Sequence, residues 1–558
     1  MSKSLLFGRP AREKLLAGAK VVCDAVGSTL GPKSSNVCIE RPFGTPQTIH
    51  DGVGVSKEID LKDPEENLGA QLIKEAAQKT NDKAGDGTTT ATILTYALAS
   101  EAIKNITAGA NPMILRKGME LAQKDIVEEL GKLSQKVKTN EEIKQIATIS
   151  AQDEMIGEMI AGAIEKLGKD CVIAVEESNT VGMDIEYKEG MQFDKGWISP
   201  YFMTKIESSE ASVEDPFIVI TDEKINTNTQ FTEWARNIEA LYTQTQAEGK
   251  DPGTIQRQMP KNIVLIVGEL SGIALASVIQ NKMQGFLNIL AIQAPSYGEK
   301  QKEYLQDIAL VTGGNLVSKD TGGSIATMKM EDFGHASRVV STKNNTMIVK
   351  GAGDRKKISE YIKRWEHIGN LKETSEFDRE RIKERVAKLT SGIAIINVGA
   401  PSEMEMREKK ERCIDAIEAT KAAVEEGIVT GGEVALLYAS QELETGVVDD
   451  ENLGYQMVLE AVKRPFKVLM ENSGYNAGQM LERLNTRMQD GDIKNPGIDV
   501  IDGEVKDMIK AGIIDPVKVS RVALENAIST AGAILTTNTL ITVIPEDKND
   551  RQPVARTG

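Results

Sequence analysis

Apolar residues in the first third of the chain recur at helical spacing. Asp63 followed by Pro64 predicts a helix start, because an acid can accept hydrogen bonds from free N–H groups and proline fits the first turn. Apolar residues then repeat at i+4 spacing until Gly85, which predicts the end of that helix. Two more helices are predicted, over residues 88–106 and 111–133.

The middle third changes to short β-branched runs bounded by glycine, proline or aspartate, a pattern that predicts buried strands. These runs occupy residues 171–175, 217–220, 263–267 and 289–292. Helical stretches such as residues 272–283 separate them, so the middle is predicted to be an α/β unit.

The last third returns to helical spacing. Helices are predicted over residues 402–426, 459–471, 504–511 and 517–533, with Pro465 expected to kink or break the second of them. A helical beginning, an α/β middle and a helical end together predict a domain inserted into a helical base.

Composition and charge narrow the function classes. Of the 558 residues, 40% are hydrophobic and 27% are charged, which is typical of a folded protein of several domains. The 83 acids and 67 bases give a net charge of −16, which argues against nucleic acid as the main partner. Four cysteines without a CxxC pair favour a reducing compartment, and three distant histidines disfavour a zinc hydrolase or a histidine-based triad. Since no signal peptide and no membrane-spanning apolar run is visible, we expect a cytoplasmic protein.

Residues 84–90 read AGDGTTT and lie between two predicted helices. The two glycines allow backbone N–H groups to approach a ligand, and the three threonines open a helix whose N-terminus favours an anion. Asp86 could hold Mg²⁺ on phosphate oxygens, since Mg²⁺ takes one or two carboxylates together with phosphates. From these residues alone, a phosphate site and a helix–turn–helix corner with a threonine cap are equally favoured.

Three other glycine motifs have plainer interpretations when each is taken alone. Residues 29–33, TLGPK, lack the P-loop spacing and predict a rigid turn. Residues 51–52, DG, predict a hairpin turn. Residues 430–432, TGG, predict a helix C-cap.

Asp415 lies on a predicted helix and shares a face with Ala419 and Ala422. A face of small residues allows close approach of another backbone, so this acid could orient or deprotonate a water molecule. Taken alone, a solvated surface acid is the favoured interpretation.

Together these segments resemble the group I chaperonins, the GroEL family. The resemblance extends from about residue 3 to residue 545, and the motifs occur in family order at family-like spacings. The AGDGTTTAT block is the most specific. The matching segments are TLGPK (29–33), DGV (51–53), AGDGTTTAT (84–92), ISA (149–151), EGMQFDKGWISPYF (189–202), AAVEEG (422–427) and GIIDP (512–516).

The resemblance implies an α+β multidomain chaperonin subunit of the GroEL type. It implies a mostly helical equatorial ATP-binding domain, a small α/β intermediate hinge domain, an inserted α/β apical substrate-binding domain and a flexible tail. Their expected ranges are residues 1–132 and 426–545, residues 133–188 and 393–425, residues 189–392, and residues 546–558.

The resemblance also assigns residues to ATP binding and hydrolysis. Asp51 and Asp415 would position the attacking water, Asp86 would ligate Mg²⁺, and Asp515 would hold the ribose hydroxyls. The cofactors implied are ATP and Mg²⁺, and family precedent extends to activation by K⁺. The implied ATP-binding residues are Thr29, Leu30, Gly31, Pro32, Asp86, Gly87, Thr88, Thr89, Thr90, Ile149, Ser150, Gly431, Gly432, Asp499, Val500 and Asp515.

The family assembles seven-membered rings and binds unfolded chains through exposed apolar residues of its apical domain. The partners implied are non-native polypeptides and further copies of this chain, with no nucleic acid and no membrane. Core packing is a competing interpretation of the apolar residues, strong for Leu275 and weaker for Trp197. The matching positions are Trp197, Tyr201, Phe202, Leu275 and Ile279.

Several positions depart from the family pattern. Ile273, Gln280 and the diverged segment 231–259 alter the expected apical surface, which leaves the use of a co-chaperonin lid open. Lys467 and Asn476 replace an arginine and a glutamate that often pair between stacked rings, which leaves the number of rings open. Such drift would suit a phage-encoded copy.

Three functions are compatible with these residues. The first is an ATP-driven folding chamber. The second is a small-molecule phosphotransferase with the same ATP site, although no residues suggest an acceptor pocket. The third is a scaffold or holdase without hydrolysis, which the presence of Asp51, Asp86 and Asp415 disfavours.

Overall fold

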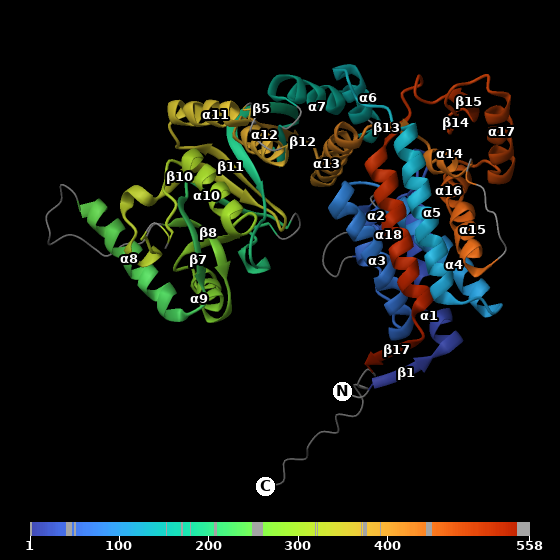
Figure 1. Cartoon of the computed structure of the whole chain (residues 1–558), viewed down its shortest axis with the longest axis horizontal. Helices are drawn as coiled ribbons and strands as arrows, with labels where there is room; N and C mark the ends of the chain where they lie inside the picture. The colour runs from blue at the N-terminus through green and yellow to red at the C-terminus, as the bar shows by residue number, and fades with distance from the viewer. Residues whose placement is uncertain are drawn as a thin grey trace, which may run out of the picture. The chain divides into compact units, whose positions relative to one another are not determined.

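The chain folds into two compact units, Met1–Ala161 with Arg407–Gly558 (unit 1) and Gly162–Met406 (unit 2), so unit 2 is an insertion in the chain of unit 1. Figure 1 shows the computed structural model with its elements labelled. The finer division into equatorial, intermediate and apical domains stays a prediction. The structure describes residues 3–40, 47–49, 52–151, 153–168, 171–178, 180–205, 209–247, 261–318, 320, 322–369, 371, 376–390, 392–441, 443 and 449–543.

Unit 1 is mainly helical, and α7 (Glu154–Leu167) and α13 (Glu403–Glu426) carry the chain between the units. Its other helices are α1 (Gly8–Gly27), α2 (Gly52–Glu58), α3 (Pro64–Ala84), α4 (Thr88–Thr107), α5 (Pro112–Leu133), α6 (Asn140–Ala151), α14 (Ala435–Gln441), α15 (Asp450–Ala461), α16 (Arg464–Asn472), α17 (Ala477–Asp490) and α18 (Val517–Thr536). Its strands pair two by two: β1 (Lys3–Phe7) with β17 (Thr539–Val543), β2 (Val37–Ile39) with β3 (Gln47–Ile49), β13 (Ile428–Thr430) with β16 (Ile514–Pro516), and β14 (Pro496–Asp499) with β15 (Glu504–Asp507).

The helix boundaries of α3 and α5 are confirmed where capping residues set them. The Asp63 carboxylate accepts hydrogen bonds from the N–H groups of Glu65 and Glu66, and Gly85 closes the helix with a φ of +73°. The Asn111 side chain caps α5 in the same way. Capping side chains therefore fix both helix starts that the sequence predicted.

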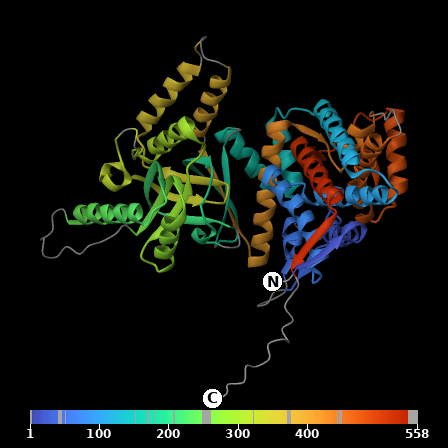
Figure 2. The same cartoon turned by 60° about the horizontal axis from the view of Figure 1, so that its bottom comes forward.

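A core of leucine, isoleucine and alanine holds α4, α5, α15 and α18 together; Leu94, Leu115, Val458 and Leu524 are fully buried in it. Figure 1 shows α4, α5 and α18 side by side in unit 1. The β1–β17 pair, seen as adjacent arrows in Figure 2, brings the two chain ends of this unit together. Segments far apart in the sequence thus form one hydrophobic core.

Three local predictions in unit 1 were wrong. Residues 504–511 are not a helix: Gly503, with a φ of +77°, turns the chain so that β15 pairs with β14. Residues 52–58, expected to follow a hairpin turn, form helix α2. Gly427, and not residues 430–432, follows the C-terminus of α13 with a positive φ. The break expected within residues 459–471 is confirmed: α15 ends at Ala461, and Pro465 lies in the first turn of α16.

Unit 2 is built on a sheet that has nine strands among the described residues. The strand order is β4-β12-β5-β11-β10-β7-β8-β9, with β6 paired to β10 off this path. The four strands predicted from the sequence are confirmed as β4, β7, β8 and β9; β7, β8 and β9 are mostly buried as expected, whereas β4, at the end of the strand order, is only partly buried. The strands are β4 (Val172–Glu177), β5 (Gly182–Asp194), β6 (Ala211–Glu214), β7 (Phe217–Ile225), β8 (Asn262–Leu270), β9 (Asn288–Gln293), β10 (Gly334–Ser341), β11 (Asn345–Gly351) and β12 (Gly392–Gly399).

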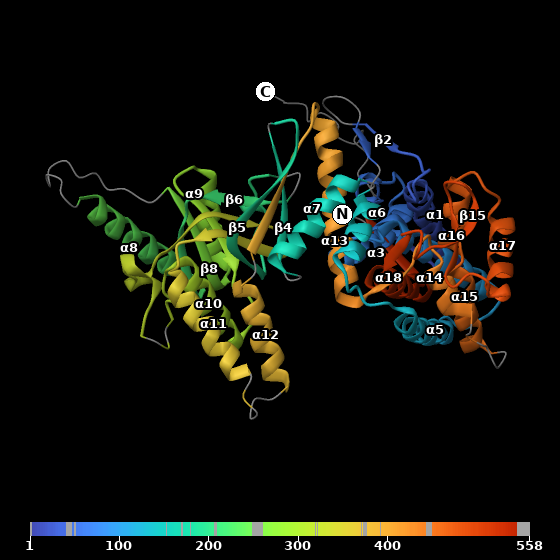
Figure 3. The same cartoon turned by 90° about the horizontal axis from the view of Figure 1, so that it is seen from above.

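The helices of unit 2 are α8 (Asn228–Ala247), α9 (Gly272–Met283), α10 (Gly298–Thr312), α11 (Arg355–Gly369) and α12 (Glu376–Thr390), with 3₁₀ turns at Pro200–Phe202, Ile325–Thr327 and Met330–Asp332. Figure 3 shows α11 and α12 side by side beyond α10. The buried Arg385 side chain ties α12 to Asp307 of α10 with two hydrogen bonds of 2.8 Å. Among the described residues, no helix is both long enough and apolar enough to cross a lipid bilayer.

Candidate functional site

The glycine–threonine loop places the free N-terminus of α4 beside an acid. Gly85 and Gly87 both have positive φ values, +73° and +80°, so the chain turns sharply between α3 and α4. The Gly87 N–H donates to the Asp86 carboxylate at 2.6 Å. The first N–H bonded within α4 belongs to Ala91, so the N–H groups of residues 88–90 lack acceptors within the helix. This helix end can receive an anion.

The N-terminus of α2 lies directly against the loop. A Cβ atom on Gly52 would stand 2.4 Å from Thr89 Oγ1 and 3.2 Å from Thr88 Oγ1. Asp51, one of the two predicted water-positioning acids, lies outside the described residues. The contact with the glycine–threonine loop is therefore shown for Gly52 alone.

Helix α13 contacts the other side of the loop. A Cβ atom on Gly85 would stand 2.3 Å from Glu418 Cβ, and Ala422 packs with Ala84 in one buried cluster. Asp415 precedes Glu418 by three residues, so it lies about one turn away on the same helix face. It is half-buried and takes part in interactions of its own, which disagrees with a freely solvated surface acid.

Two further carboxylates gather at the strand pair β13–β16. Asp515 lies opposite Val429 in this pair, close to the backbone N–H groups of Gly432 and Glu433. Burial, with repulsion from Glu433 and Asp86, raises the pKa of Asp515 to about 8. Burial, with repulsion from Asp86, raises the pKa of Glu433 to about 7, although its hydrogen bond from Thr90 acts in the opposite direction. The three acids therefore form a crowded negative centre beside α4.

The glycine pair of the 430–432 motif connects this centre to the β14–β15 hairpin. The Gly431 N–H donates to Ile513 O at 3.1 Å, and a Cβ atom on Gly432 would stand 3.0 Å from Met508 Cε. In the hairpin, the Asp499 carboxylate accepts from Lys506 at 2.7 Å, and Val500 is buried.

The turn that contains Thr29, Leu30, Gly31 and Pro32 follows α1. Asn472 of α16 donates to Leu30 O at 2.9 Å. Lys33 donates to Ile501 O at 3.0 Å, which links this turn to the end of the hairpin that holds Asp499 and Val500.

Ile149 and Ser150 lie in the last turn of α6. Ile149 Cδ1 stands 3.9 Å from the position of a Cβ atom on Gly512, immediately before β16. All the described nucleotide-site candidates thus fall in unit 1. They group around two neighbouring regions, the α4 N-terminus and the loops of β13, β14 and β16.

The arrangement fits a Mg²⁺–nucleotide. In the part of the chain that the structure describes, no three His, Cys, Asp or Glu side chains could hold a metal ion by themselves. Mg²⁺ suits such a site, because it takes one or two carboxylates and completes its shell with phosphates and water. Asp86 is placed to supply a carboxylate. Glu433 is a further acid near Asp86 that the sequence reasoning missed. Its position directly after two glycines was the one signal in the sequence that could have indicated a functional residue.

Comparison with known proteins agrees with the fold. Residues 22–545 match the TCP-1/cpn60 chaperonin family. The chain belongs to this family. Two structures of the chaperonin gp146 from bacteriophage EL 2 (Pseudomonas aeruginosa), both determined in the presence of ATP-BeFx, are similar at 20% identity over 97% of this chain and 99% of theirs, with TM-scores of 0.72 and 0.62. The GroEL-type α+β subunit predicted from the sequence is confirmed.

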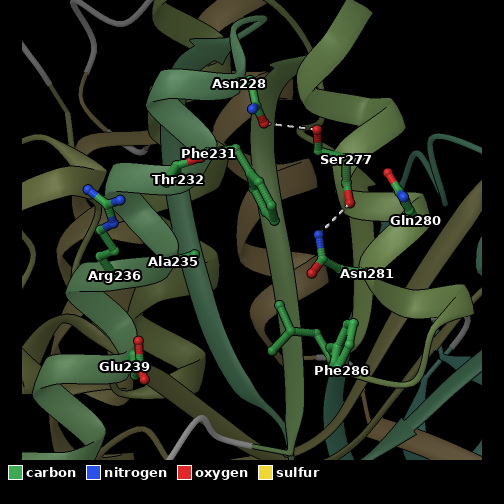
Figure 4. Close-up of a pocket in the computed structure, with 11 residues that line it drawn as sticks. Asn228, Phe231, Thr232, Ala235, Arg236, Glu239, Ser277, Gln280, Asn281 and Phe286 are labelled. Carbon is green, nitrogen blue, oxygen red and sulfur yellow. Dashed lines mark hydrogen bonds between the residues drawn. The ribbon is translucent and has the colours of Figure 1, made fainter. Parts of the chain in front are cut away.

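The chaperonin has a polar groove between α8 and α9 in unit 2. The groove has a volume of about 460 Å³, and Figure 4 shows the side chains of both helices that line it. Asn228 of α8 accepts from Ser277 of α9 at 2.9 Å, while Arg236 and Glu239 extend the α8 wall. Phe286, 72% exposed, adds an apolar side chain beyond α9.

The predicted polypeptide-binding residues differ in exposure. Tyr201 is 64% exposed, whereas Phe202 is fully buried and belongs to the core of unit 2 in this structure. Trp197 is half-buried, and its Nε1 donates to Ser209 O at 3.1 Å. Leu275 and Ile279 pack partly against the same core. Other large apolar side chains of unit 2 are also exposed: Ile273, which the sequence analysis noted as a departure from the family pattern, and Met283, Phe286 and Tyr297, which it did not consider.

Proposed function

We propose that this chaperonin is an ATPase that couples Mg²⁺–ATP binding and hydrolysis in unit 1 to the binding and refolding of non-native polypeptides by unit 2. Identical subunits would assemble into a ring that encloses a folding chamber, and we take seven subunits per ring as the working model. The observation that carries the proposal is the convergence of α2, α4, α13 and β16 on one corner that contains clustered acids and N–H groups without acceptors in the helix.

Each part of this corner has a chemical role. The N–H groups and hydroxyls of residues 88–90 would hold phosphate oxygens, since a helix N-terminus favours anions. Asp86 would ligate Mg²⁺, which neutralises phosphate charge when bound. Asp415, with Asp51, would orient the attacking water and accept its proton. Gly431, Gly432 and Asp515 would contact the nucleoside. Phosphoryl transfer of this kind depends on positioning and electrostatics.

Polypeptide binding would use the exposed apolar residues of unit 2. Tyr201, Ile273, Met283 and Phe286 are each more than 60% exposed. Exposed apolar side chains gathered on one surface commonly bind partners. The polar wall of the α8–α9 groove sets this surface apart from a purely apolar one.

Replacement of Asp415 by alanine tests the catalytic assignment. Asp415→Ala should lower the rate of phosphate release at least about 100-fold while the calorimetric affinity for ATP changes less than about threefold, because a water-orienting acid acts mainly in the transition state. Glu411→Ala, which removes an exposed acid one turn away on α13, is the matched control. Normal turnover in Asp415→Ala would exclude this residue as the catalytic acid.

Particle mass separates the folding chamber from the alternatives. Seven copies of the 60.7-kDa chain would weigh about 425 kDa, and two such rings about 850 kDa. Light scattering with and without ATP should give one of these masses. A monomer in both conditions would exclude the chamber and favour a phosphotransferase, whereas a ring without phosphate release would favour a scaffold.

A further inference from the structure

Glu433 occupies a backbone conformation that seldom suits a glutamate. It lies between β13 and α14 and has a φ of +61°, directly after Gly432 at +78°. A residue with a Cβ atom is strained in this left-handed region, and such residues cluster at functional sites. The strained position brings the Glu433 side chain to the first turn of α4.

The Glu433 carboxylate takes the hydrogen bond that Thr90 could give to a phosphate. Thr90 Oγ1 donates to Glu433 Oε1 at 2.5 Å. The nearby hydroxyls of Thr92 and Thr95 instead donate to carbonyl oxygens of their own helix, four residues back. Thr90 therefore directs its hydroxyl away from α4, and a carboxylate accepts from it.

The charged neighbours of Glu433 are acids. Asp86 acts on Glu433 by repulsion, and Asp515 is repelled by both of them. A phosphate that accepted a hydrogen bond from Thr90 would come within about 5 Å of the Glu433 carboxylate, where like charges repel strongly in a partly buried site. A divalent cation bound to the phosphates would lower their negative charge and so weaken this repulsion.

We propose that Glu433 competes with nucleotide phosphates for Thr90 and thereby makes nucleotide binding depend on a divalent cation. This inference rests on the proposed ATP site and adds to it a residue that determines which form of the nucleotide binds. Glu433 discriminates against the free nucleotide and admits the Mg²⁺ complex.

The test measures a linkage ratio, the Kd for ADP in EDTA divided by the Kd for ADP in Mg²⁺, by calorimetry on the full-length chain. ADP avoids turnover during the titration. Glu433→Gln keeps the shape and the ability to accept from Thr90 but removes the charge. It should tighten metal-free ADP binding at least about tenfold and leave Mg²⁺–ADP binding within about threefold, so that the ratio falls at least about threefold.

One further variant of Glu433 and one control variant at another acid complete the test. Glu433→Gly removes the competing group and suits the left-handed backbone, so it should fold and lower the ratio in the same direction. Glu425→Gln, an acid of α13 that pairs with Lys518 at 2.7 Å, should leave the ratio unchanged.

The outcomes are distinct. An unchanged ratio in both Glu433 variants would refute the competition, and weaker Mg²⁺–ADP binding in Glu433→Gln would show instead that Glu433 ligates the cation. If the unaltered protein bound no nucleotide in either condition, the proposed ATPase function itself would fail, and this inference with it.

Discussion

The buried Arg385 is predicted to be a main anchor of unit 2. Its Nε and Nη2 atoms donate to the two carboxylate oxygens of Asp307 at 2.8 Å, and Nη1 donates to Glu303 at 3.0 Å. Nη2 also donates to Tyr361 at 2.9 Å, and the guanidinium carbon stands 4.5 Å from the Trp365 ring centroid. One side chain therefore joins α10, α11 and α12.

Arg385→Met should cost unit 2 about 3–5 kcal/mol, because Asp307, only 1% exposed, would keep a buried charge without its partner. For a domain of this size the loss corresponds to a fall in the urea midpoint of roughly 1–2 M. All three tryptophans, Trp197, Trp234 and Trp365, belong to unit 2, so indole fluorescence follows the unfolding of this unit alone.

A double variant and a surface control complete the experiment. Arg385→Met combined with Asp307→Leu should recover at least half of the loss, since an apolar pair of similar volume can replace a buried ion pair. Lys224→Met, which breaks an exposed pair with Glu269, should shift the free energy by no more than about 1 kcal/mol. If Arg385→Met shifted the midpoint no further than Lys224→Met, the anchoring argument would be refuted.

Two other predictions concern unit 1. Gly87→Ala should weaken ADP binding at least about tenfold and destabilise unit 1 by more than about 1–2 kcal/mol, because its Cβ would meet Val519 Cγ1 at 2.6 Å and the backbone would be strained in the left-handed region. Gly474 has a φ of +83° and open space around it, so Gly474→Ala should show the effect of backbone strain alone. Equal melting temperatures of the two variants would contradict this reasoning. After brief alkylation of the folded protein, mass spectrometry should find label at the exposed Cys38 and little label at the other three cysteines, which are buried. Burial also raises the pKa of the Cys23 and Cys413 thiols to about 12, which lowers their reactivity. Rapid labelling of Cys413 in the folded protein would contradict the structure.

Sequence patterns predicted the elements whose ends carry their own chemical signals. Capping rules alone were enough to predict the start of α3 at Asp63–Pro64 and its end at Gly85. The apolar runs of β8 and β9 were enough to predict two buried strands. Local patterns failed where a partner segment decides the conformation. Residues 504–507 form a strand because they pair with β14, and the sequence of these residues alone does not indicate that pairing.

The candidate site shows the same limit. The sequence marks Asp86 and the threonines, because glycine spacing alone indicates a loop that approaches a ligand. It does not mark Glu433, whose significance comes from a left-handed backbone and a contact with Thr90, 343 positions away in the chain. The structure is required to place these two residues together.

The glycines of the loop have a second role that a phosphate-binding motif does not predict. Gly85 leaves room for the side chain of Glu418 on α13, and Gly87 leaves room for the side chain of Val519 near the start of α18. A side chain at either position would hold these helices away from the α4 N-terminus, even if the N–H groups still faced a phosphate. Because Asp415 is on α13 and Asp515 lies two residues before α18, the same two glycines would set how close both acids lie to the phosphates in the proposed site. The loop would therefore set the geometry of the proposed site as well as its affinity for phosphate, so substitutions there should lower the rate of phosphate release more than the affinity for ADP.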